Sequence, residues 1–452
     1  MSIEQLYGLW KASKGVNTDS RTIQPGQIFV ALKGDTFDGN AYALRALEAG
    51  AAYAIVSSPS VISSEVEKSR LILVEDTLQT LKELAAYHRS QLGIPVIGLT
   101  GTNGKTTTKE LIREVLGTTF RVSATQGNLN NDIGVPLTVL SIPEDAEIAV
   151  VEMGANHPED IAALTWVSQP TFGLITNVGK AHLEGFGSFD GVKRAKGRLY
   201  DWLSEHDGQA FVNVDSEDLY EMACARPLSI IPYGVQSEDV KVLEASAAEP
   251  YLRMVVDGRL LETHLVGAYN ATNVMAAITV GRFFGVSLAS ALEAIAAYQP
   301  SMNRSQLVRS ASNTIIEDAY NANPSSMAVA LDNLAAMSGP RVALLGEMRE
   351  LGADSVAEHA AVLRRLLGMG LTCVCLVGEQ FRLAASGNPG AEPLVISGAE
   401  PLVISSEVEK SIHFFATSDA LAAWLAEHPI TGCTVLVKGS RGTRMEKVLP
   451  AL

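Results

Sequence analysis

The chain is poor in cysteine and carries no thiol pattern of a metal or disulfide framework. Paired thiols at short, repeated spacings are typical of zinc sites and of small secreted domains. None of the 4 cysteines stands in a CxxC pair, and all of them lie in or beside apolar runs. We therefore expect reduced cysteines packed in the protein core, namely Cys224, Cys373, Cys375 and Cys433.

The sequence also lacks a long hydrophobic run, and its first residues do not show the pattern expected of a leader segment. No uninterrupted apolar stretch approaches the roughly 20 residues that a membrane-spanning helix needs. Residues 1–16 contain no basic segment followed by an apolar one, the pattern of a secretory signal. These absences predict a cytoplasmic protein that does not insert into membranes, and we expect a monomer.

Clusters of positive charge are missing as well. The net charge is -15, from 35 lysines and arginines against 50 acidic residues, and the basic residues are scattered along the chain. Nucleic acids and anionic membranes bind proteins through clustered cationic faces. Neither is expected as a partner, so any phosphate group must be bound at a local site.

Length and composition predict several globular domains. A chain of 452 residues with 47% hydrophobic composition exceeds what one core accommodates. Strand patterns alternate with helical patterns, which is typical of parallel sheets covered by helices. We predict an α/β protein with a small α/β domain over 1–90, a central parallel-sheet domain over 91–300 and a Rossmann-like, doubly wound domain over 301–452. The expected strands are 28–32, 53–56, 71–74, 96–100, 149–152, 172–177, 314–317, 342–345, 372–377 and 434–437, and the expected helices are 42–49, 106–117, 325–337, 355–367 and 419–427.

A nine-residue sequence, VISSEVEKS, occurs at 61–69 and again at 403–411. A partial copy, PLVIS, precedes the second at 393–397. Structural repeats need about three or more units to stack a shared core. Duplicated DNA inserted into tolerant surface loops is the better explanation, and we expect no function for it.

A glycine-rich segment, GLTGTNGKTTT at 98–108, lies between a predicted strand and a predicted helix. In this setting backbone N–H groups and the helix N-terminus bind polyphosphate, a lysine neutralises its charge and a hydroxyl ligates Mg²⁺. Lys105 and Thr106 stand at the corresponding positions. The alternative is a glycine-rich turn with an incidental lysine. We predict ATP binding by Thr100, Gly101, Thr102, Asn103, Gly104, Lys105, Thr106 and Thr107.

The form of this loop resembles that of Mur ligases and folylpolyglutamate synthases, because Leu99 stands where the common phosphate-loop pattern has glycine. Four further segments resemble the dipeptide-adding branch of the Mur ligase family. The resemblance implies peptidoglycan precursor synthesis: ATP-dependent attachment of D-alanyl-D-alanine to UDP-N-acetylmuramoyl-tripeptide through an acyl phosphate. The four segments are 126–138 (QGNLNNDIGVPLT), 152–157 (EMGANH), 318–324 (DAYNANP) and 345–352 (LGEMRELG).

Three residues outside the loop are candidates for its metal chemistry. Glu152 ends a predicted strand at the sheet edge where ligands of such folds collect, and a carboxylate suits Mg²⁺. A lone histidine, or a lysine on a basic helix, is more often structural or solvated. The resemblance implies instead that His182 binds metal and that Lys196 carries a carbamate that helps to hold a second Mg²⁺. The predicted catalytic set is Lys105, Lys196, His182 and Glu152, and the predicted metal set is Thr106, Glu152, His182 and Lys196.

The remaining candidates are polar residues of turns and helix starts. Asn270 and Asn273 stand three apart on one helix face and can present amides to one ligand, although helix capping is the alternative. The resemblance places them at the adenine, and places Arg304 and Asp318 at the phosphates and ribose of ATP. Turn formation is the alternative for most of the others. The resemblance assigns Ser20, Arg21, Lys33, Asp38 and Asn40 to the uridine diphosphate end, and the other predicted substrate-binding residues are Asn128, Asn130, Asn131, Asn321, Asn323, Lys438, Ser440 and Arg441.

Other functions stay open at this point. A Mur ligase that adds a single amino acid, or a folate-type polyglutamate ligase, would share the phosphate loop. A regulatory ATPase that kept the fold without ligase chemistry is the alternative from another class, and the presence of Glu152, His182 and Lys196 argues against it. The base that deprotonates the acceptor amine and the diamino acid of the tripeptide are left unassigned.

Overall fold

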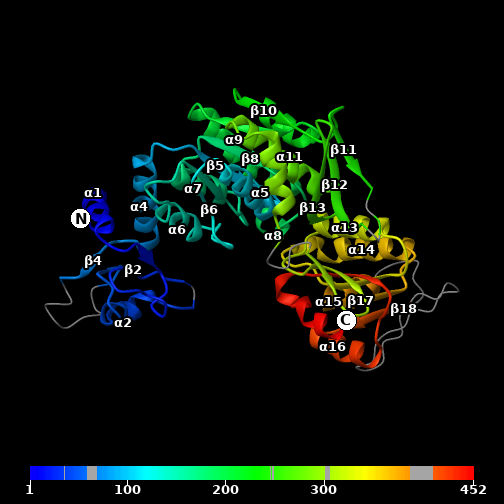
Figure 1. The fold of residues 1–452 in the computed structure, drawn as a ribbon. Coiled ribbons are helices and arrows are strands. Elements are labelled where there is room, and N and C mark those ends of the chain that lie inside the picture. Colours follow the sequence, from blue (N-terminus) through cyan, green and yellow to red (C-terminus); the bar gives the residue numbers. More distant parts are fainter. Residues whose placement is uncertain (35, 59–68, 245, 247–248, 301–305, 387–410) are drawn as a thin grey trace.

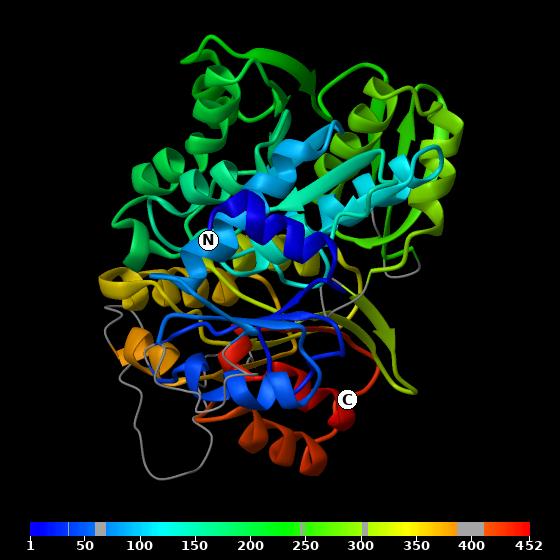
Figure 2. The ribbon, with the colours of Figure 1, turned by 90° about the vertical axis from the view of Figure 1, so that its left-hand side faces the viewer.

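The computed structural model describes residues 1–34, 36–58, 69–244, 246, 249–300, 306–386 and 411–452. The chain forms an arch of three lobes, with the N-terminus in the first and the C-terminus in the third (Figure 1). Seen along the arch, the first lobe lies in front of the third and both lie below the central one (Figure 2). Arg304 and nearly all of both nonapeptide copies lie outside the described residues.

The first lobe contains a four-stranded parallel sheet in the order β1-β2-β3-β4. Its middle strands are apolar and wholly buried along most of their length, as the sequence pattern predicts. The expected strands and helix of this lobe are confirmed. The elements are α1 (Ile3–Lys11), β1 (Val16–Asn17), β2 (Ile28–Val30), η1 (Gly39–Tyr42), α2 (Ala43–Glu48), β3 (Tyr53–Val56) and β4 (Leu71–Leu73).

Helix α4 (Thr77–Gln91) joins the first lobe to the central one. Asp76 caps its N-terminus by accepting a hydrogen bond from the backbone N–H of Gln79 at 2.9 Å. It packs on α1 at one side and on α6 and α7 of the central lobe at the other. Near its end, buried Arg89 donates to the carbonyl oxygens of Ser168 and Leu92. The two lobes therefore share one hydrophobic core around α4.

The central lobe is built on a six-stranded parallel sheet in the order β10-β9-β8-β5-β7-β6. A three-stranded antiparallel sheet, which the sequence reading did not foresee, packs beside it through a common core. The strands are β5 (Val96–Thr100), β6 (Val122–Ala124), β7 (Ile148–Glu152), β8 (Phe172–Ile175), β9 (Gln209–Asn213), β10 (Ser229–Tyr233), β11 (Val240–Leu243), β12 (Tyr251–Val256) and β13 (Arg259–Val266). The helices are α5 (Lys105–Gly117), α6 (Gly134–Leu140), α7 (Asp160–Ser168), α8 (Leu183–Phe186), α9 (Phe189–Glu205), α10 (Glu217–Cys224), α11 (Asn270–Phe283) and α12 (Leu288–Ala297).

The third lobe is a doubly wound sheet in the order β14-β15-β19-β16-β17-β18, parallel except for the edge strand β14. Every strand and helix expected here is confirmed to within a few residues. The strands are β14 (Gln306–Arg309), β15 (Thr314–Asp318), β16 (Arg341–Gly346), β17 (Cys373–Val377), β18 (Ser411–Phe415) and β19 (Thr434–Lys438). The helices are α13 (Pro324–Ala336), η2 (Gly352–Asp354), α14 (Ser355–Gly368), α15 (Glu379–Ser386), α16 (Ser418–Glu427), η3 (Arg441–Thr443) and η4 (Met445–Ala451).

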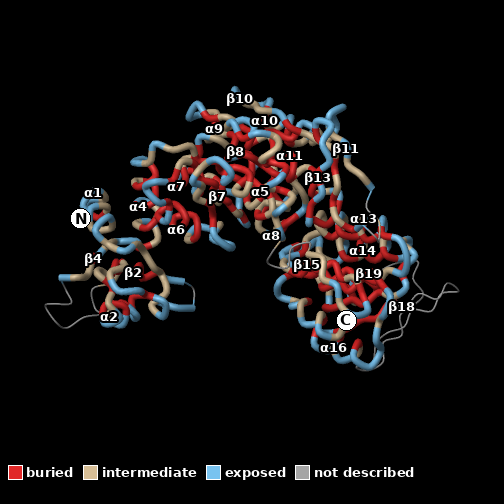
Figure 3. Tube along the Cα trace, viewed as in Figure 1, coloured by how far each residue is buried: buried red, intermediate tan, exposed pale blue. Residues whose placement is uncertain are grey.

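Burial follows the sheets, with buried residues running through the centre of each lobe and exposed ones on the outer helices and turns (Figure 3). All four cysteines are free thiols. The expectation of core cysteines holds for Cys375 and Cys433, but Cys224 is exposed at the end of α10 and was wrongly placed in the core. Among the described residues, no helix has both the length and the apolar character that crossing a bilayer requires.

Asn313, in the turn before β15, fastens the end of the chain to the third lobe. Its amide Nδ2 donates to the carbonyl oxygens of Ile430 at 2.7 Å and Leu452 at 2.9 Å. Its Oδ1 accepts from the backbone N–H of Cys433 at 3.1 Å. The side chain is buried, so the carbonyl oxygen of Ile430 and the N–H of Cys433 would lose these hydrogen bonds without it. The Leu452 oxygen would keep its bonds from the hydroxyls of Ser310 and Ser312.

We predict that Asn313→Ala lowers the free energy of unfolding of the third lobe by about 2–4 kcal/mol, since each buried group left unsatisfied costs roughly 1–3 kcal/mol. Urea denaturation followed by circular dichroism measures this change. Asn333→Ala, on the partly exposed face of α13, is the matched control and should leave stability nearly unchanged. Equal stability of the two variants would contradict the anchoring role.

Candidate active site

The phosphate loop joins β5 to α5 and depends on two glycines. Gly101 has φ +147°, and a Cβ at this position would lie 1.9 Å from Oγ1 of Thr176. Gly104, the N-cap of α5, is left-handed with φ +77° and lies against the Asn273 amide. A side chain at Gly101 would collide with Thr176, which follows β8, and a side chain at Gly104 would strain the left-handed backbone. The loop thus needs glycine at both places.

The segment that follows β8 holds the loop in place. The carbonyl oxygen of Asn177 accepts from the N–H of Thr102 at 3.0 Å, and its side-chain Oδ1 accepts from the N–H of Asn103 at 3.0 Å. Thr176 Oγ1 and Asn177 Nδ2 both donate to the carbonyl oxygen of Asn103, at 2.6 and 2.9 Å. These bonds fix the loop's path, and the sequence reading missed Thr176 and Asn177. Their position at the end of an expected strand, beside the loop's own strand, was the available signal.

Two lysines converge on one backbone carbonyl. Lys105 Nζ donates to the oxygen of Gly101 at 2.7 Å and to that of Thr102 at 3.2 Å. Lys196 Nζ, from α9, donates to the same Gly101 oxygen at 3.1 Å. Lys196 is only 3% exposed. Burial, and then the nearby Lys105 charge, hold the pKa of Lys196 well below its usual value. The solvated-face interpretation of Lys196 is therefore wrong.

Glu152 ends β7 as expected, and its carboxylate is buried beside the loop. Its Oε1 accepts from Thr106 Oγ1 at 3.1 Å and from Asn130 Nδ2 at 2.8 Å. Its Oε2 is buried with no hydrogen-bond partner among the described residues. Buried carboxylate oxygens are ordinarily satisfied, so this oxygen has the properties expected of a cation ligand.

His182 lies in a left-handed conformation, φ +51°, just before α8. Its Nδ1 hydrogen-bonds to the carboxylate of Glu350 from the third lobe, which is itself left-handed with φ +62°. Burial lowers the pKa of His182, Glu350 opposes that shift, and Lys105 and Lys196 add to it. The described residues contain no cluster of three or more histidine, cysteine or acidic side chains suited to a metal.

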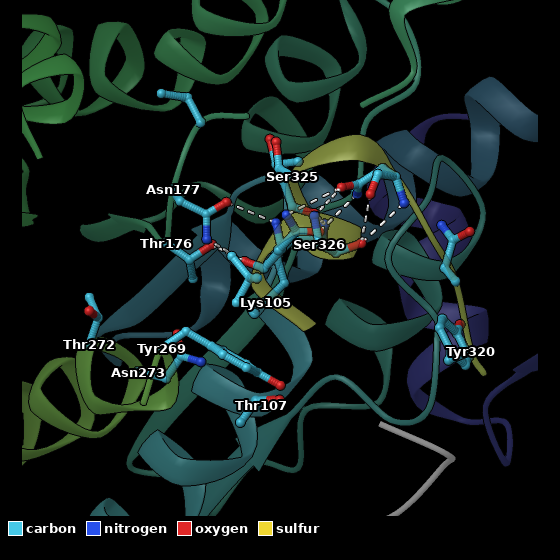
Figure 4. A pocket seen from close by; sticks show the side chains of 18 of the residues that line it. Lys105, Thr107, Thr176, Asn177, Tyr269, Thr272, Asn273, Tyr320, Ser325 and Ser326 are labelled. Atoms are coloured by element: carbon cyan, nitrogen blue, oxygen red, sulfur yellow. Dashed lines mark hydrogen bonds between the residues drawn. The ribbon is translucent and has the colours of Figure 1, made fainter. Parts of the chain in front are cut away.

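A cavity of about 550 Å³ opens over the phosphate loop between the central and third lobes. Figure 4 shows Lys105 near its centre, with Tyr269, Asn273 and Thr107 at one side and Tyr320 at the other. A second cavity, of about 540 Å³, is lined by Arg349 and Arg441 of the third lobe. The two cavities share the lining residues Asn156, His182, Tyr320, Asn321 and Asn323.

Asn270 and Asn273 do lie on one face of α11, and their amides bond to each other at 2.9 Å. Asn270 Nδ2 also donates to the carbonyl oxygen of Val266 at 2.8 Å, while Asn273 Oδ1 accepts from Thr108 Oγ1 at 3.1 Å. Both asparagines line the first cavity. Neither amide caps α11, whose N-cap is Tyr269 without a side-chain cap bond, so the helix-capping alternative is wrong. The two side chains tie α11 to the phosphate-loop helix and face the first cavity.

The third lobe contributes a buried ion pair to the first cavity. Lys438 Nζ, 1% exposed, contacts Asp318 Oδ2 at 2.5 Å and donates to the carbonyl oxygen of Asn321 at 3.1 Å. Arg441 lies over the ring of Tyr320, 5.5 Å from its centroid. In this arrangement Lys438 is engaged within the lobe, whereas Arg441, like Arg349, lines the second cavity.

Contacts across the junction connect the loop to α13. The amide of Asn323, the N-cap of α13, donates to Oδ1 of Asn103 at 2.8 Å. The backbone N–H of Lys180 donates to Ser325 Oγ at 2.9 Å, and its ammonium contacts Glu358 at 2.7 Å. The third lobe thus packs directly on the phosphate loop and on the segment after β8.

Comparison with known proteins agrees with this architecture. The profile of the Mur ligase family, catalytic domain, matches residues 13–89, that of the Mur ligase middle domain matches 99–281, and that of the Mur ligase, glutamate ligase domain matches 303–441. A UDP-N-acetylmuramoyl-tripeptide–D-alanyl-D-alanine ligase of Bacillus subtilis is 34% identical, over 97% of this chain and 93% of the relative. The Escherichia coli ligase of the same name is 34% identical, over 99% and 95%.

The chain belongs to the Mur ligase family.

Solved Mur ligases have the same arrangement of lobes. MurF from Acinetobacter baumannii superposes with a TM-score of 0.82 at 29% identity, covering 99% of this chain and 98% of that one. MurF from Thermotoga maritima in complex with ADP superposes with a TM-score of 0.80 at 27% identity, covering 97% of both chains. The three-lobed α/β fold predicted from the sequence is confirmed.

The residues assigned to the uridine diphosphate end lie in the first lobe, apart from both cavities. Arg21 is paired with Asp19 at 2.7 Å. Asp38 caps η1 and accepts from the Asn40 amide at 2.6 Å, and Asn40 in turn accepts from the N–H of Ser57 at 2.9 Å. Asp38 and Asn40 thus shape the turn, as the turn-forming alternative expects. Ser20 and Lys33 lie in the same region of the lobe.

In segment 126–131, which follows β6, two of the three predicted substrate-binding asparagines make structural hydrogen bonds and the third is exposed. Asn130 contacts Glu152, and Asn131 Oδ1 accepts from the N–H of Gly134 at 2.8 Å at the start of α6. Asn128 is exposed. In the third lobe, Ser440 is buried and bonded to the carbonyl oxygen of Glu347. The sequence reading missed Tyr320 and Glu350 as site residues, although both lie within the motifs at 318–324 and 345–352.

We predict that Lys105→Ala folds normally but loses ~10²-fold or more in kcat, since one charge-assisted contact to a transferring phosphoryl group contributes several kcal/mol at the transition state. ADP release in a coupled assay measures the loss, and thermal unfolding verifies the fold. Lys241→Ala, at the exposed position of β11, is the matched lysine control and should keep full activity. Full turnover by Lys105→Ala would contradict the phosphate-loop assignment.

Proposed function

We propose that this Mur ligase joins D-alanyl-D-alanine to UDP-N-acetylmuramoyl-tripeptide at the expense of ATP, giving the pentapeptide precursor of peptidoglycan. The observation that carries the proposal is the pair of cavities at the junction of the central and third lobes, which share five lining residues. One cavity contains the phosphate loop and the other contains two arginines. Curated relatives of this name match nearly the full chain, which supports the same substrates.

The chemistry follows from the low reactivity of a carboxylate. An oxygen of the tripeptide's terminal carboxylate attacks the γ-phosphorus of ATP, a P–O bond forms, and the bond to ADP breaks. The amine of D-alanyl-D-alanine then attacks the acyl carbon, the C–N bond forms, and inorganic phosphate leaves. The amine's proton passes to a base that we leave unassigned.

The phosphate loop contributes positioning and charge to the first step. The Lys105 ammonium, held by two loop carbonyls, lies where it can neutralise charge on the transferring group. The bonds from Asn177 keep the loop rigid, so little reorganisation is needed during the reaction. The third lobe packs over the loop through Asn323 and so limits access of water to the acyl phosphate.

The donor set beside the loop fits Mg²⁺. The unpartnered Glu152 Oε2, the Thr106 hydroxyl and the His182 imidazole are the residues that would hold the ion, with a carbamate on Lys196 for a second ion. Bound Mg²⁺ would neutralise phosphate charge during transfer. The Asn130 amide and the Thr106 hydroxyl orient the Glu152 carboxylate in advance.

The carbamate on Lys196 is supported by the convergence of two ammonium groups on the Gly101 carbonyl. A buried amine of lowered pKa is neutral more often than an ordinary lysine and is therefore a better nucleophile toward CO₂. Attack by the amine nitrogen forms a C–N bond and releases one proton. The product is an anion, which replaces repulsion between the two lysines by attraction.

The remaining assignments complete the proposal. We assign the adenine to the cavity wall of Asn270 and Asn273, and the acceptor carboxylate to Arg441. The first lobe, within residues 1–90, would receive the uridine diphosphate end, and residues 91–300 and 301–452 would form the ATP-binding and acceptor domains. Arg304 remains a proposed ATP contact, since its position lies outside the described residues.

An acceptor screen tests the function. The enzyme is incubated with ATP, Mg²⁺, UDP-N-acetylmuramoyl-tripeptide and a panel of single D- and L-amino acids and dipeptides, and products are identified by mass. We expect a pentapeptide product with D-alanyl-D-alanine and little product with single amino acids. Preference for a single amino acid would contradict the dipeptide assignment, and ATP hydrolysis without any acceptor would favour a regulatory ATPase.

We predict that Lys196→Ala lowers kcat ~10²-fold or more, because it removes an anionic group that stabilises phosphoryl transfer. Acetate or formate should partly restore its activity by supplying a carboxylate in the vacated space. Lys105→Ala, which lacks a positive charge instead, should gain nothing from the same additives. Rescue of Lys196→Ala by small amines equal to that by carboxylates would disprove the carbamate.

A further inference from the structure

Lys109 is a wholly buried cation that the mechanism above does not use. It lies on α5 one turn beyond Thr106 and is 0% exposed. Its Nζ donates to the carbonyl oxygen of Thr125 at 2.6 Å and contacts the Glu110 carboxylate at 2.7 Å. Removing an ammonium from water is costly unless its partners are well placed. A lysine at this position therefore requires a specific explanation.

The partner of Lys109 leads directly to Glu152. Thr125 follows β6 and is itself 1% exposed. Its Oγ1 accepts from the backbone N–H of Glu152 at 2.9 Å, while its carbonyl oxygen accepts from Lys109. Thr106, three residues before Lys109, donates to the Glu152 carboxylate. Helix α5 therefore reaches Glu152 twice, once through Thr106 and once through Lys109 and Thr125.

The same contact fixes the start of the asparagine-rich segment 126–131. This segment begins immediately after Thr125, and its Asn130 donates to Glu152 Oε1. The carbonyl oxygen of Asn130 accepts from the N–H of Gly154 at 2.7 Å. A displacement of Thr125 would therefore move both the backbone of Glu152 and the amide that orients its carboxylate.

We propose that Lys109 is a positioning residue that couples the phosphate-loop helix to Glu152 and to segment 126–131. The proposal rests on the proposed function only in taking the phosphate loop as the nucleotide site. Nucleotide seated at the N-terminus of α5 fixes the helix, and Lys109 passes that constraint to Thr125 and hence to Glu152. Glu110 balances the buried charge and also contacts Arg113 at 2.8 Å on the outer face of α5.

If Lys109 has only a structural role, the expected effects of its substitution differ. If Lys109 only filled space, an apolar side chain of similar length would restore packing, and Lys109→Met would alter stability without altering catalysis. Arginine is not a conservative replacement, because its larger planar fork does not reproduce the contacts that one compact ammonium makes with the Thr125 carbonyl and the Glu110 carboxylate. Lys109→Met and Thr125→Val are therefore the informative variants, since each removes one contact of the chain from α5 to Glu152 and keeps the side-chain volume similar.

Hydrogen exchange of the full-length protein provides a readout that needs no ligase substrate. In Lys109→Met, the amides of 125–131 and of 152–154 should exchange ~10-fold or more faster than in the wild type, the factor expected on loss of one net hydrogen bond. Amides of β19 in the third lobe should be unchanged. Binding of ATP with Mg²⁺, measured by calorimetry, should also weaken in the variant.

Kinetics complete the test. We expect Lys109→Met and Thr125→Val each to lower kcat ~10-fold or more, and the double variant to lose little more than the larger single loss, because both interrupt one chain of contacts. Asn313→Ala is the control, since it destabilises the third lobe without touching the phosphate loop and should keep its kcat when assayed well below its unfolding temperature. If Lys109→Met does not fold, the same exchange, calorimetric and kinetic measurements are made on Thr125→Val.

Unchanged exchange at 152–154 together with unchanged kcat in Thr125→Val would overturn the proposal, and so would additive losses in the double variant. Failure of the proposed function would be distinguishable, because it would alter the acceptor screen of the wild type and leave the exchange and calorimetric results as they are.

Discussion

Two lysines on different helices donate to the carbonyl oxygen of Gly101, and this convergence constrains the rest of the active site. Two ammonium groups that share one carbonyl oxygen and are partly or wholly buried repel each other. Burial and the Lys105 charge lower the pKa of Lys196, and the cavity over the loop leaves space for the phosphates of a nucleotide. An anionic ligand is therefore favoured on electrostatic grounds, although the chain as a whole is acidic.

The third lobe depends on the same loop. Asn323, at the N-terminus of α13, bonds to the side chain of Asn103, so a residue of the phosphate loop also serves as a contact of the interface between lobes. Glu350 reaches His182 from the opposite side of that interface. Because these contacts involve residues that line the first and the second cavity, the position of the third lobe and the arrangement around the phosphate loop are physically linked. Ligation requires such a link, since the acyl phosphate must meet the acceptor before water does.

Much of the fold was predictable, because segments whose sequence favours a buried strand do form the buried strands of the sheets. The runs 96–100 and 434–437 are apolar and β-prone, and both are fully buried central strands. The antiparallel sheet of β11 to β13 was missed, although β12 alternates half-buried and buried residues with the period of two that marks a one-sided sheet. The predicted boundary at residue 90 lies at the end of α4. This helix packs on both lobes, which is a tertiary property that composition does not record.

Some residues of the candidate site were likewise predictable from local sequence, and others were not. Glu152 was predictable from its place at a strand end, whereas the burial of Lys196 was misjudged from the basic residues around it. The helical periodicity predicts a buried position instead. Lys196 stands four residues after Val192 and three before Leu199, so the three share one face of α9, and both neighbours are buried. The contact between Asn103 and Asn323 joins positions 220 residues apart, and no local pattern predicts it.

Asparagine recurs at the contacts that shape the site because an amide can fix a loop without adding charge. Asn177 both accepts from the N–H and donates to the carbonyl oxygen of Asn103, which satisfies both backbone groups of one loop residue. Asn273 accepts from Thr108 and donates to Asn270, and so joins two helices. A carboxylate at either position would repel the phosphates, and an added cation would raise the repulsion around Gly101. Neutral amides therefore fix the loop and leave the charge around it to Lys105, Lys196 and Glu152.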